Sequence, residues 1–228
     1  MKKEQLLESK FKSLAGQSLQ EEIANSITHG LGIIFSIIAL IALIYESKTK
    51  ANTAIHIFSC TFYGISMVLL YLFSTLYHAI SHISVKKVLR RLDHIGIYLL
   101  IFGTYLPISL IILHGPLGWT LFGIEAGLCF IGVLFKAIFG PKLEVLSGIF
   151  YLLMGWVSVI AFKSIYEAIS FEGFFWILLG GLFYTLGIIF FAIDKKVPFF
   201  HAIWHVFVLL GSICHFFMVI NYAIPFSW

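Results

Sequence analysis

Two histidines, His201 and His205, stand four residues apart in an apolar stretch of the chain. On a helix this spacing places both imidazoles on one face, with a rise of about 6 Å between them. Paired histidines at this spacing bind one metal ion in metallopeptidase helices. A third imidazole, His78, on a facing helix would complete three nitrogen ligands, and three protein ligands plus water are typical of a catalytic zinc site. The residues therefore predict a Zn²⁺ site with an open coordination position.

Two further polar residues are expected beside these histidines. Asp93 offers a carboxylate that could orient or deprotonate water at the metal, and Ser74, one helical turn before His78, could donate a supporting hydrogen bond. Histidines and an aspartate at helix ends can instead act only as caps and hydrogen-bonding groups. Haem fits less well, because its axial ligands lie on opposite faces of the ring. From these residues alone, a metal site and a structural role both stay open.

The composition indicates that lipid is the main solvent of the chain. Of its 228 residues, 60% are hydrophobic, 17% are aromatic and only 11% are charged, and the mean hydropathy is +1.00. Soluble domains carry about 25% charged residues, so this chain could not cover its surface in water. The net charge of +4 is small and forms no basic stripe, which argues against nucleic acid as a partner. Membrane lipids are the expected partners, and the residues carry no signal for an oligomeric state.

Seven apolar segments, each long enough to cross a bilayer, predict an all-α integral membrane protein. They fall at residues 28–45, 53–77, 93–113, 118–139, 145–162, 174–193 and 199–220. Short connections make neighbouring helices antiparallel, which predicts a seven-transmembrane helix bundle. We divide the chain into a cytoplasmic amino-terminal segment, residues 1–27, and a membrane domain, residues 28–228. Leu7, Phe11 and Leu14 have the spacing of an interfacial helix, although a solvated tail fits them equally well.

The basic residues predict the orientation of this bundle. Twelve of the fifteen lysines and arginines fall in the amino-terminal segment and in alternate loops, and three fall on the opposite side. The positive-inside rule then puts the amino terminus in the cytoplasm and the carboxyl terminus outside. This orientation brings the candidate ligands and Asp93 to the cytoplasmic third of the membrane from segments remote in sequence. A multi-pass protein of the plasma membrane, in a bacterium the inner membrane, is expected.

The other polar residues of the apolar segments are expected to support or cap the structure. Glu22, Asn25 and His29 begin the first segment on the side of the candidate site, where they would support the metal ligands or cap an entrance. Glu125 lies too far from the cytoplasmic side to serve a metal there. His94 is expected on a different helix face from its neighbour in the chain. Packing or interfacial roles are expected for His56, His82, His114 and His215.

The ordered motifs around these residues resemble the hemolysin III family, the bacterial branch of the progestin and adipoQ receptor family. In chain order they are Glu22-Ile-Ala-Asn25-Ser-Ile-Thr28-His29, Ser74-Thr-Leu-Tyr-His78, Asp93-His94-Ile-Gly-Ile-Tyr98, Tyr151-Leu-Leu-Met-Gly-Trp156, Gly181-Leu-Phe-Tyr-Thr-Leu-Gly187 and His201-Ala-Ile-Trp-His205. The resemblance implies seven helices with a cytoplasmic amino terminus and zinc near the inner leaflet. It implies His78, His201 and His205 as zinc ligands, with Asp93 at the water of the metal and Ser74 in support.

Three hypotheses for function follow. The first is a zinc-dependent hydrolase that cleaves an amide or ester bond of a lipid near the cytoplasmic leaflet, with Asp93 as general base. This reaction class is implied by the alkaline ceramidases of the wider superfamily. The second is a non-catalytic lipid sensor or membrane-homeostasis protein in which zinc is structural. The third is a pore-forming hemolysin, which the scarcity of charge disfavours because it leaves no polar channel lining.

Overall fold

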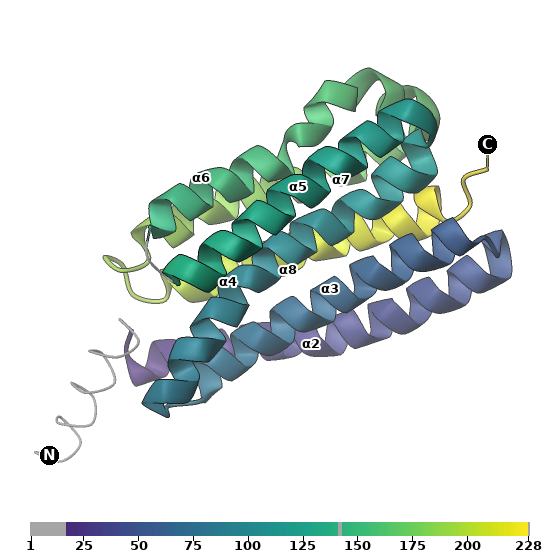
Figure 1. Cartoon of the computed structure of the whole chain (residues 1–228). Helices are drawn as coiled ribbons and strands as arrows, with labels where there is room; N and C mark the ends of the chain where they lie inside the picture. Colours follow the sequence, from purple (N-terminus) through teal and green to yellow (C-terminus); the bar gives the residue numbers. More distant parts are fainter. Residues whose placement is uncertain (1–16, 141–142, 228) are drawn as a thin grey trace, which may run out of the picture.

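The computed structural model describes residues 17–140 and 143–227, and within these ranges every regular element is a helix. The α-helices are, in chain order, α2 (Leu19–Glu46), α3 (Ala54–Ala79), α4 (Ile83–Leu106), α5 (Gly115–Phe139), α6 (Glu144–Gly155), α7 (Phe162–Ile193) and α8 (Phe200–Met218). They form an elongated bundle in which most helices lie roughly along one common axis (Figure 1). The predicted all-α class is confirmed.

Short helical segments of a different pitch extend several of these helices. The π-helical segments η1 (Ser47–Ala51), η2 (Pro107–Leu113) and η4 (Val219–Ala223) continue α2, α4 and α8, and the 3-10 segment η3 (Val157–Ala161) joins α6 to α7. Pro107 begins η2, and proline lacks the N–H that an α-helical ladder would need at that position. The pitch therefore changes where the ladder is interrupted.

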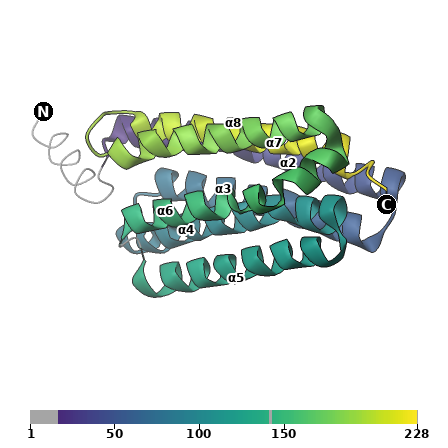
Figure 2. The same ribbon diagram turned by 90° about the horizontal axis from the view of Figure 1, so that it is seen from above.

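Six helical stretches in the described ranges are long and apolar enough to cross a membrane. Five of them match predicted segments one to one: Leu19–Ala51, Ala54–Ala79, Ile83–Leu113, Gly115–Phe139 and Phe200–Ala223. The remaining stretch, Glu144–Ile193, is 50 residues long and contains the two other predicted segments. It is broken at η3 and at Ser170, whose φ is 59°. Accordingly, α6 begins and α7 ends at the same end of the bundle (Figures 1 and 2).

Two helices begin earlier than hydropathy predicts. The first starts at Leu19 and the third at Ile83, before the expected starts at residues 28 and 93. A capping box starts α2: the Ser18 side chain accepts from the Glu21 N–H, and the Glu21 carboxylate accepts from the Ser18 N–H at 2.8 Å. Polar residues therefore form the first turns, and α2 crosses the boundary drawn after residue 27. The interfacial helix predicted around Leu7 falls outside the described residues.

The first helix shows how polarity is distributed in this bundle. Its buried face carries mainly small and polar residues: Glu22, Asn25, His29, Gly32, Ser36, Ala39 and Leu43. Its exposed face carries branched apolar side chains such as Ile27, Ile34 and Ile38. Polar residues of membrane helices face the bundle interior because lipid cannot hydrogen-bond to them. The buried polar side chains of α2 therefore face the neighbouring helices.

Four helix ends meet at one end of the bundle, which we call the histidine end (residues 19–29, 74–79, 83–94 and 200–205). There α2, α4 and α8 begin and α3 ends. Helix α3 packs against both α2 and α4, and α8 packs against α7 and α2 (Figure 2). Residues far apart in sequence are therefore neighbours at this end.

Candidate metal centre

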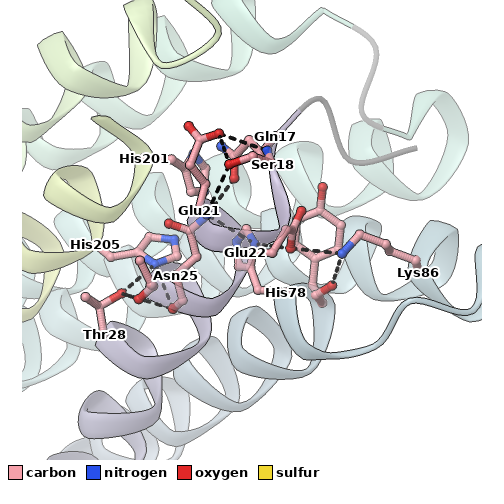
Figure 3. A network of polar contacts seen from close by, with 12 residues as sticks. Gln17, Ser18, Glu21, Glu22, Asn25, Thr28, His78, Lys86, His201 and His205 are labelled. Carbon is pink, nitrogen blue, oxygen red and sulfur yellow. Dashed lines mark hydrogen bonds and ion pairs between the residues drawn. The ribbon is translucent and has the colours of Figure 1, made fainter. Parts of the chain in front are cut away.

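Three histidines from two helices meet at the histidine end (Figure 3). His78 lies in the last turn of α3, and His201 and His205 lie on consecutive turns at the start of α8. One candidate ligand atom from each side chain lies within 4.8 Å of the other two. The ring centroids are 4.6 to 5.1 Å apart. The structure thus brings together the three histidines that the sequence singled out, and the group could hold a metal ion.

An ion pair between α2 and α4 holds the Nδ1 atom of His78. This atom lies 2.9 Å from Glu22 Oε2, and the Lys86 ammonium donates to the same oxygen at 3.0 Å. Lys86 also donates to the Tyr77 carbonyl oxygen at 2.7 Å. Glu22 is 2% exposed and Lys86 is 5% exposed, so the pair is shielded from solvent. Because a carboxylate only accepts, His78 Nδ1 carries the proton and Nε2 keeps its lone pair.

The other two histidines are oriented in the same way. His201 Nδ1 lies 2.7 Å from Asp194 Oδ2, in the turn between α7 and α8. His205 Nδ1 lies 3.3 Å from the Asn25 carbonyl oxygen and 3.1 Å from Thr28 Oγ1. An oxygen acceptor at Nδ1 fixes each ring as the Nδ1–H tautomer. Histidines that bind metals usually donate their second ring N–H to such an oxygen.

The Nε2 atom of His78 tests whether a metal fits this arrangement. It is buried and has no hydrogen-bond partner among the described residues. A buried nitrogen without a partner is costly, by about 1–3 kcal/mol, and its lone pair is the one that a metal would use. Neutral imidazoles suit zinc, copper, iron and nickel. The donor set therefore fits a transition-metal ion, and three ligands leave a position open.

The structure places the Asp93 carboxylate at the same end of the bundle. Asp93 is buried in α4 and lines the same cavity as the three histidines. It interacts electrostatically with His201. Ser74 is fully buried in α3, one turn before His78. Both Asp93 and Ser74 therefore lie at the histidine end.

Two further histidines border the group. His29 of α2 stacks on His205, with 3.5 Å between the ring centroids and 13° between the planes. His94 lines the same cavity as Asp93. Adjacent residues on a helix point about 100° apart, and the wall that α4 contributes is broad enough to include both. Glu22, Asn25 and His29 all lie next to the ligands.

An elongated cavity extends from the three histidines into the bundle. Its volume is about 310 Å³, and its wall comes from α2, α3, α4, α6, α7 and α8. The wall is largely apolar along its length: Leu100, Ile101, Ile108, Leu152, Phe174, Ile177, Ile188 and Val208. Charged lining residues gather at the histidine end: Arg90, Asp93, Glu144, Asp194 and Lys195. A cavity of this kind suits an elongated apolar ligand with one polar group near the histidines.

Several residues of the site carry no clear signal in the sequence. Lys86 belongs to the basic residues that indicate orientation, yet its ammonium turns inward to Glu22. Asp194 stands beside two lysines in a polar connection, where an ordinary loop is the natural interpretation. Glu144 pairs with both Arg90 and Lys195, which links α6 to α4 and to the turn before α8. Such partners depend on which loops the fold brings together.

The remaining buried polar residues lie away from the metal centre. Glu125 is fully buried in α5, neither carboxylate oxygen has a hydrogen-bond partner among the described residues, and it lies outside the described cavity lining. His56 Nδ1 lies 2.6 Å from Thr53 Oγ1, and its Nε2 lies 3.3 Å from the Phe226 carbonyl oxygen. His56 thus has the packing role expected of it.

The fold and the site define a multi-pass helical membrane protein with a three-histidine group that could hold a metal ion. The chain belongs to the haemolysin-III-related family, whose family model matches residues 17–216. This confirms the resemblance seen in the ordered motifs. Together with its bacterial relatives, the apolar helices place the protein in the bacterial cell membrane, as a multi-pass protein.

Relatives align over most of the chain. "Hemolysin-3" of Bacillus cereus is 50% identical over 209 residues, which cover 92% of this chain and 94% of that protein. "Hemolysin-3 homolog" of Bacillus subtilis strain 168 is 47% identical over 207 residues, covering 91% and 96%. A human protein, "Monocyte to macrophage differentiation factor", is 29% identical over 213 residues, covering 89% and 84%. The similarity therefore spans the helices that carry the three histidines.

Proposed function

We propose that this protein is a zinc-dependent hydrolase that cleaves an amide or ester bond of a membrane lipid. One observation carries the proposal: three histidines with fixed Nδ1–H tautomers meet a buried carboxylate, Asp93, at the end of an apolar cavity. A structural zinc site usually closes all four positions with protein ligands, whereas three ligands leave room for a reacting group.

The proposal includes seven membrane crossings with a cytoplasmic amino terminus. The 50-residue stretch Glu144–Ile193 is too long for one crossing, since a helix of about 20 residues spans a bilayer. Its break at Ser170, with α6 beginning and α7 ending at the same end of the bundle, supports two crossings. Seven of the ten basic residues in the described ranges then fall on the side of the histidine end, which supports a cytoplasmic position for the site.

The ligand residues would hold zinc through Nε2 of His78, His201 and His205. A bound zinc ion would supply Lewis acidity at the carbonyl oxygen of the substrate and at the attacking water. The acceptors at Nδ1, Glu22 and Asp194 among them, keep each ring from turning. They also make the imidazoles more basic, which strengthens the ligands. The chain thereby presets the donor geometry.

Asp93 is suited to proton transfer in this reaction. Its carboxylate would accept a proton from the water whose oxygen bonds to the carbonyl carbon. It would then pass that proton to the amine or alkoxide that leaves as the amide or ester bond breaks. Ser74, buried at the same end of the bundle, would position it. The apolar wall of the cavity would exclude other water and hold the acyl chain of the substrate.

A second candidate function is a lipid sensor in which zinc is structural. The observation that favours it is the number of elements that one ion would join. The ligands come from α3 and α8, and their hydrogen-bond acceptors come from α2 and the turn after α7. A single ion could therefore hold these elements in one arrangement, and a lipid in the cavity could change that arrangement without being cleaved.

Hydrolysis assays on the purified full-length protein separate the two candidates. Wild type, Asp93→Asn and Glu125→Gln are incubated with micelles of an N-acyl amide lipid or an ester phospholipid, and released fatty acid is measured by mass spectrometry. Glu125→Gln is the matched control, because it makes the same change in a buried carboxylate outside the cavity lining of the described chain. We expect Asp93→Asn to lower the rate about 10²- to 10⁴-fold with zinc retained and Glu125→Gln to leave it unchanged. Zinc without any release by wild type would contradict the hydrolase and favour the sensor.

A further inference from the structure

The cavity has a second polar region far from the three histidines. Its lining includes His215 of α8 and Tyr184 of α7. The two rings stack, with 5.6 Å between centroids and 18° between planes. His215 is only 6% exposed, and neither of its ring nitrogens has a hydrogen-bond partner among the described residues. A buried, unpaired imidazole in a largely apolar cavity wall indicates a ligand that supplies the missing hydrogen bond.

Close helix packing keeps these two rings in place. A Cβ atom added to Gly180 of α7 would lie 2.3 Å from His215 Cδ2, and one added to Gly211 of α8 would lie 2.5 Å from Tyr184 Cε1. Each ring therefore occupies the space that the glycine of the facing helix leaves free. The imidazole cannot turn away to find a partner elsewhere without moving α7 or α8.

The hydroxyl of Tyr184 is anchored but not saturated. It lies 3.0 Å from Ser212 Oγ, which also accepts a hydrogen bond of 2.7 Å from Tyr71. A tyrosine hydroxyl can donate one hydrogen bond and accept others, so Tyr184 keeps capacity for a ligand. His215 and Tyr184 together offer a donor and an acceptor at one point of the cavity.

The distance between the two polar regions follows from the helix. Ten residues separate His205 from His215 on α8, which is a rise of about 15 Å. The wall between them is apolar and includes Val208 of α8 and Ile188 of α7. A fully extended hydrocarbon chain of roughly a dozen carbon atoms spans this rise of about 15 Å. An occupant with polar atoms at both points and methylene groups between them would match the cavity.

We propose that the cavity binds an acyl chain with a hydroxyl group near its twelfth carbon, and that His215 and Tyr184 bind this hydroxyl. A hydroxyl donates and accepts at once, so it can satisfy the imidazole whichever nitrogen carries the proton. A plain alkyl chain would leave His215 unpaired. The inference deepens the proposed function by naming its substrate class, and the acyl carboxyl group would lie toward the histidine end.

Fatty-acid binding to the full-length protein in detergent micelles tests this site without requiring turnover. The probes are 12-hydroxyoctadecanoic, 3-hydroxyoctadecanoic and octadecanoic acids, each competing with a fluorescent fatty acid. We expect wild type to bind the 12-hydroxy acid about tenfold more tightly than the other two, the value of one buried hydrogen bond. His215→Phe and Tyr184→Phe should reduce this preference to less than threefold, whereas His56→Phe, outside the described cavity lining, should keep it.

Equal binding of the three acids by wild type, or no binding of any, would overturn the inference. So would a preference that survives His215→Phe. The wild-type comparison needs no variant, so a folding defect in His215→Phe does not remove the test. Zinc content and hydrolysis are measured on the same samples. Preference for the 12-hydroxy acid without zinc or hydrolysis would support the hydroxyl site and refute the hydrolase. Hydrolysis without that preference would support the hydrolase and refute the hydroxyl site.

Discussion

Glu22→Gln tests how the metal ligands are held. The Glu22 carboxylate accepts from His78 Nδ1 at 2.9 Å and from Lys86 at 3.0 Å, and all three side chains are buried. The substitution keeps the size of the side chain but removes its charge. It should therefore weaken the orientation of His78 and, separately, leave the Lys86 ammonium without its counter-charge.

The two effects have different magnitudes and different readouts. Replacing the charged acceptor behind a ligating histidine with a neutral amide should lower metal affinity, by up to the about 10- to 100-fold typical of such partners, which competition with a zinc chelator measures. A buried charge left alone destabilises by about 3–5 kcal/mol, which thermal unfolding in detergent detects as a lower Tm. The double variant Glu22→Gln/Lys86→Met removes the stranded charge. It should recover most of the lost stability while zinc affinity stays low.

The matched control is Glu46→Gln, at the other end of the same helix. Glu46 pairs with Lys50 at 2.7 Å, four residues on, and Lys50 is more than half exposed. Such a pair contributes about 0.3–0.5 kcal/mol, so Tm and zinc affinity should hardly change. If Glu22→Gln lowers Tm but binds zinc as wild type does, Glu22 does not orient His78 and the reasoning is refuted.

Further variants test packing, topology and lysis. Gly132→Ala should destabilise by about 1–3 kcal/mol, because its Cβ would lie 2.2 Å from the Tyr98 ring, whereas Gly123→Ala, with no atom within 4 Å, should not lower Tm. Asn52→Cys should react with an impermeant maleimide in intact cells, and Ser81→Cys only after permeabilisation. The reverse pattern would contradict a cytoplasmic histidine end. The native cysteines are buried, so they should contribute little background labelling. Purified protein in vesicles should release no trapped dye, since a lytic pore would need a polar channel lining; release would favour the pore former.

The sequence was informative about the ligands because their signals are local or topological. His201 and His205 share one helix face through their spacing, and counting basic residues places His78 at the same end of the bundle. The same count of basic residues places Ser74 and Asp93 at that end of the bundle. None of this requires knowing which loops touch.

The partners of the ligands could not be predicted, because they depend on tertiary contacts. Asp194 looks like a loop residue until the turn after α7 folds back on His201. From the sequence, Lys86 is interpreted as a surface cation, but in the fold its ammonium donates a hydrogen bond to the buried Glu22 carboxylate. His94 follows Asp93 in the chain, and the sequence could not show that both side chains line one cavity. The break at Ser170 was likewise visible only as a polar interruption between two apolar segments.

The metal content of the purified full-length protein tests the central claim most directly. Inductively coupled plasma mass spectrometry of wild type should give about one zinc per chain, since His78, His201 and His205 form one three-ligand group. His201→Ala should lose that zinc while remaining folded by circular dichroism, and His56→Ala should retain it. Zinc absent from wild type, or retained at full occupancy in folded His201→Ala, would contradict the account.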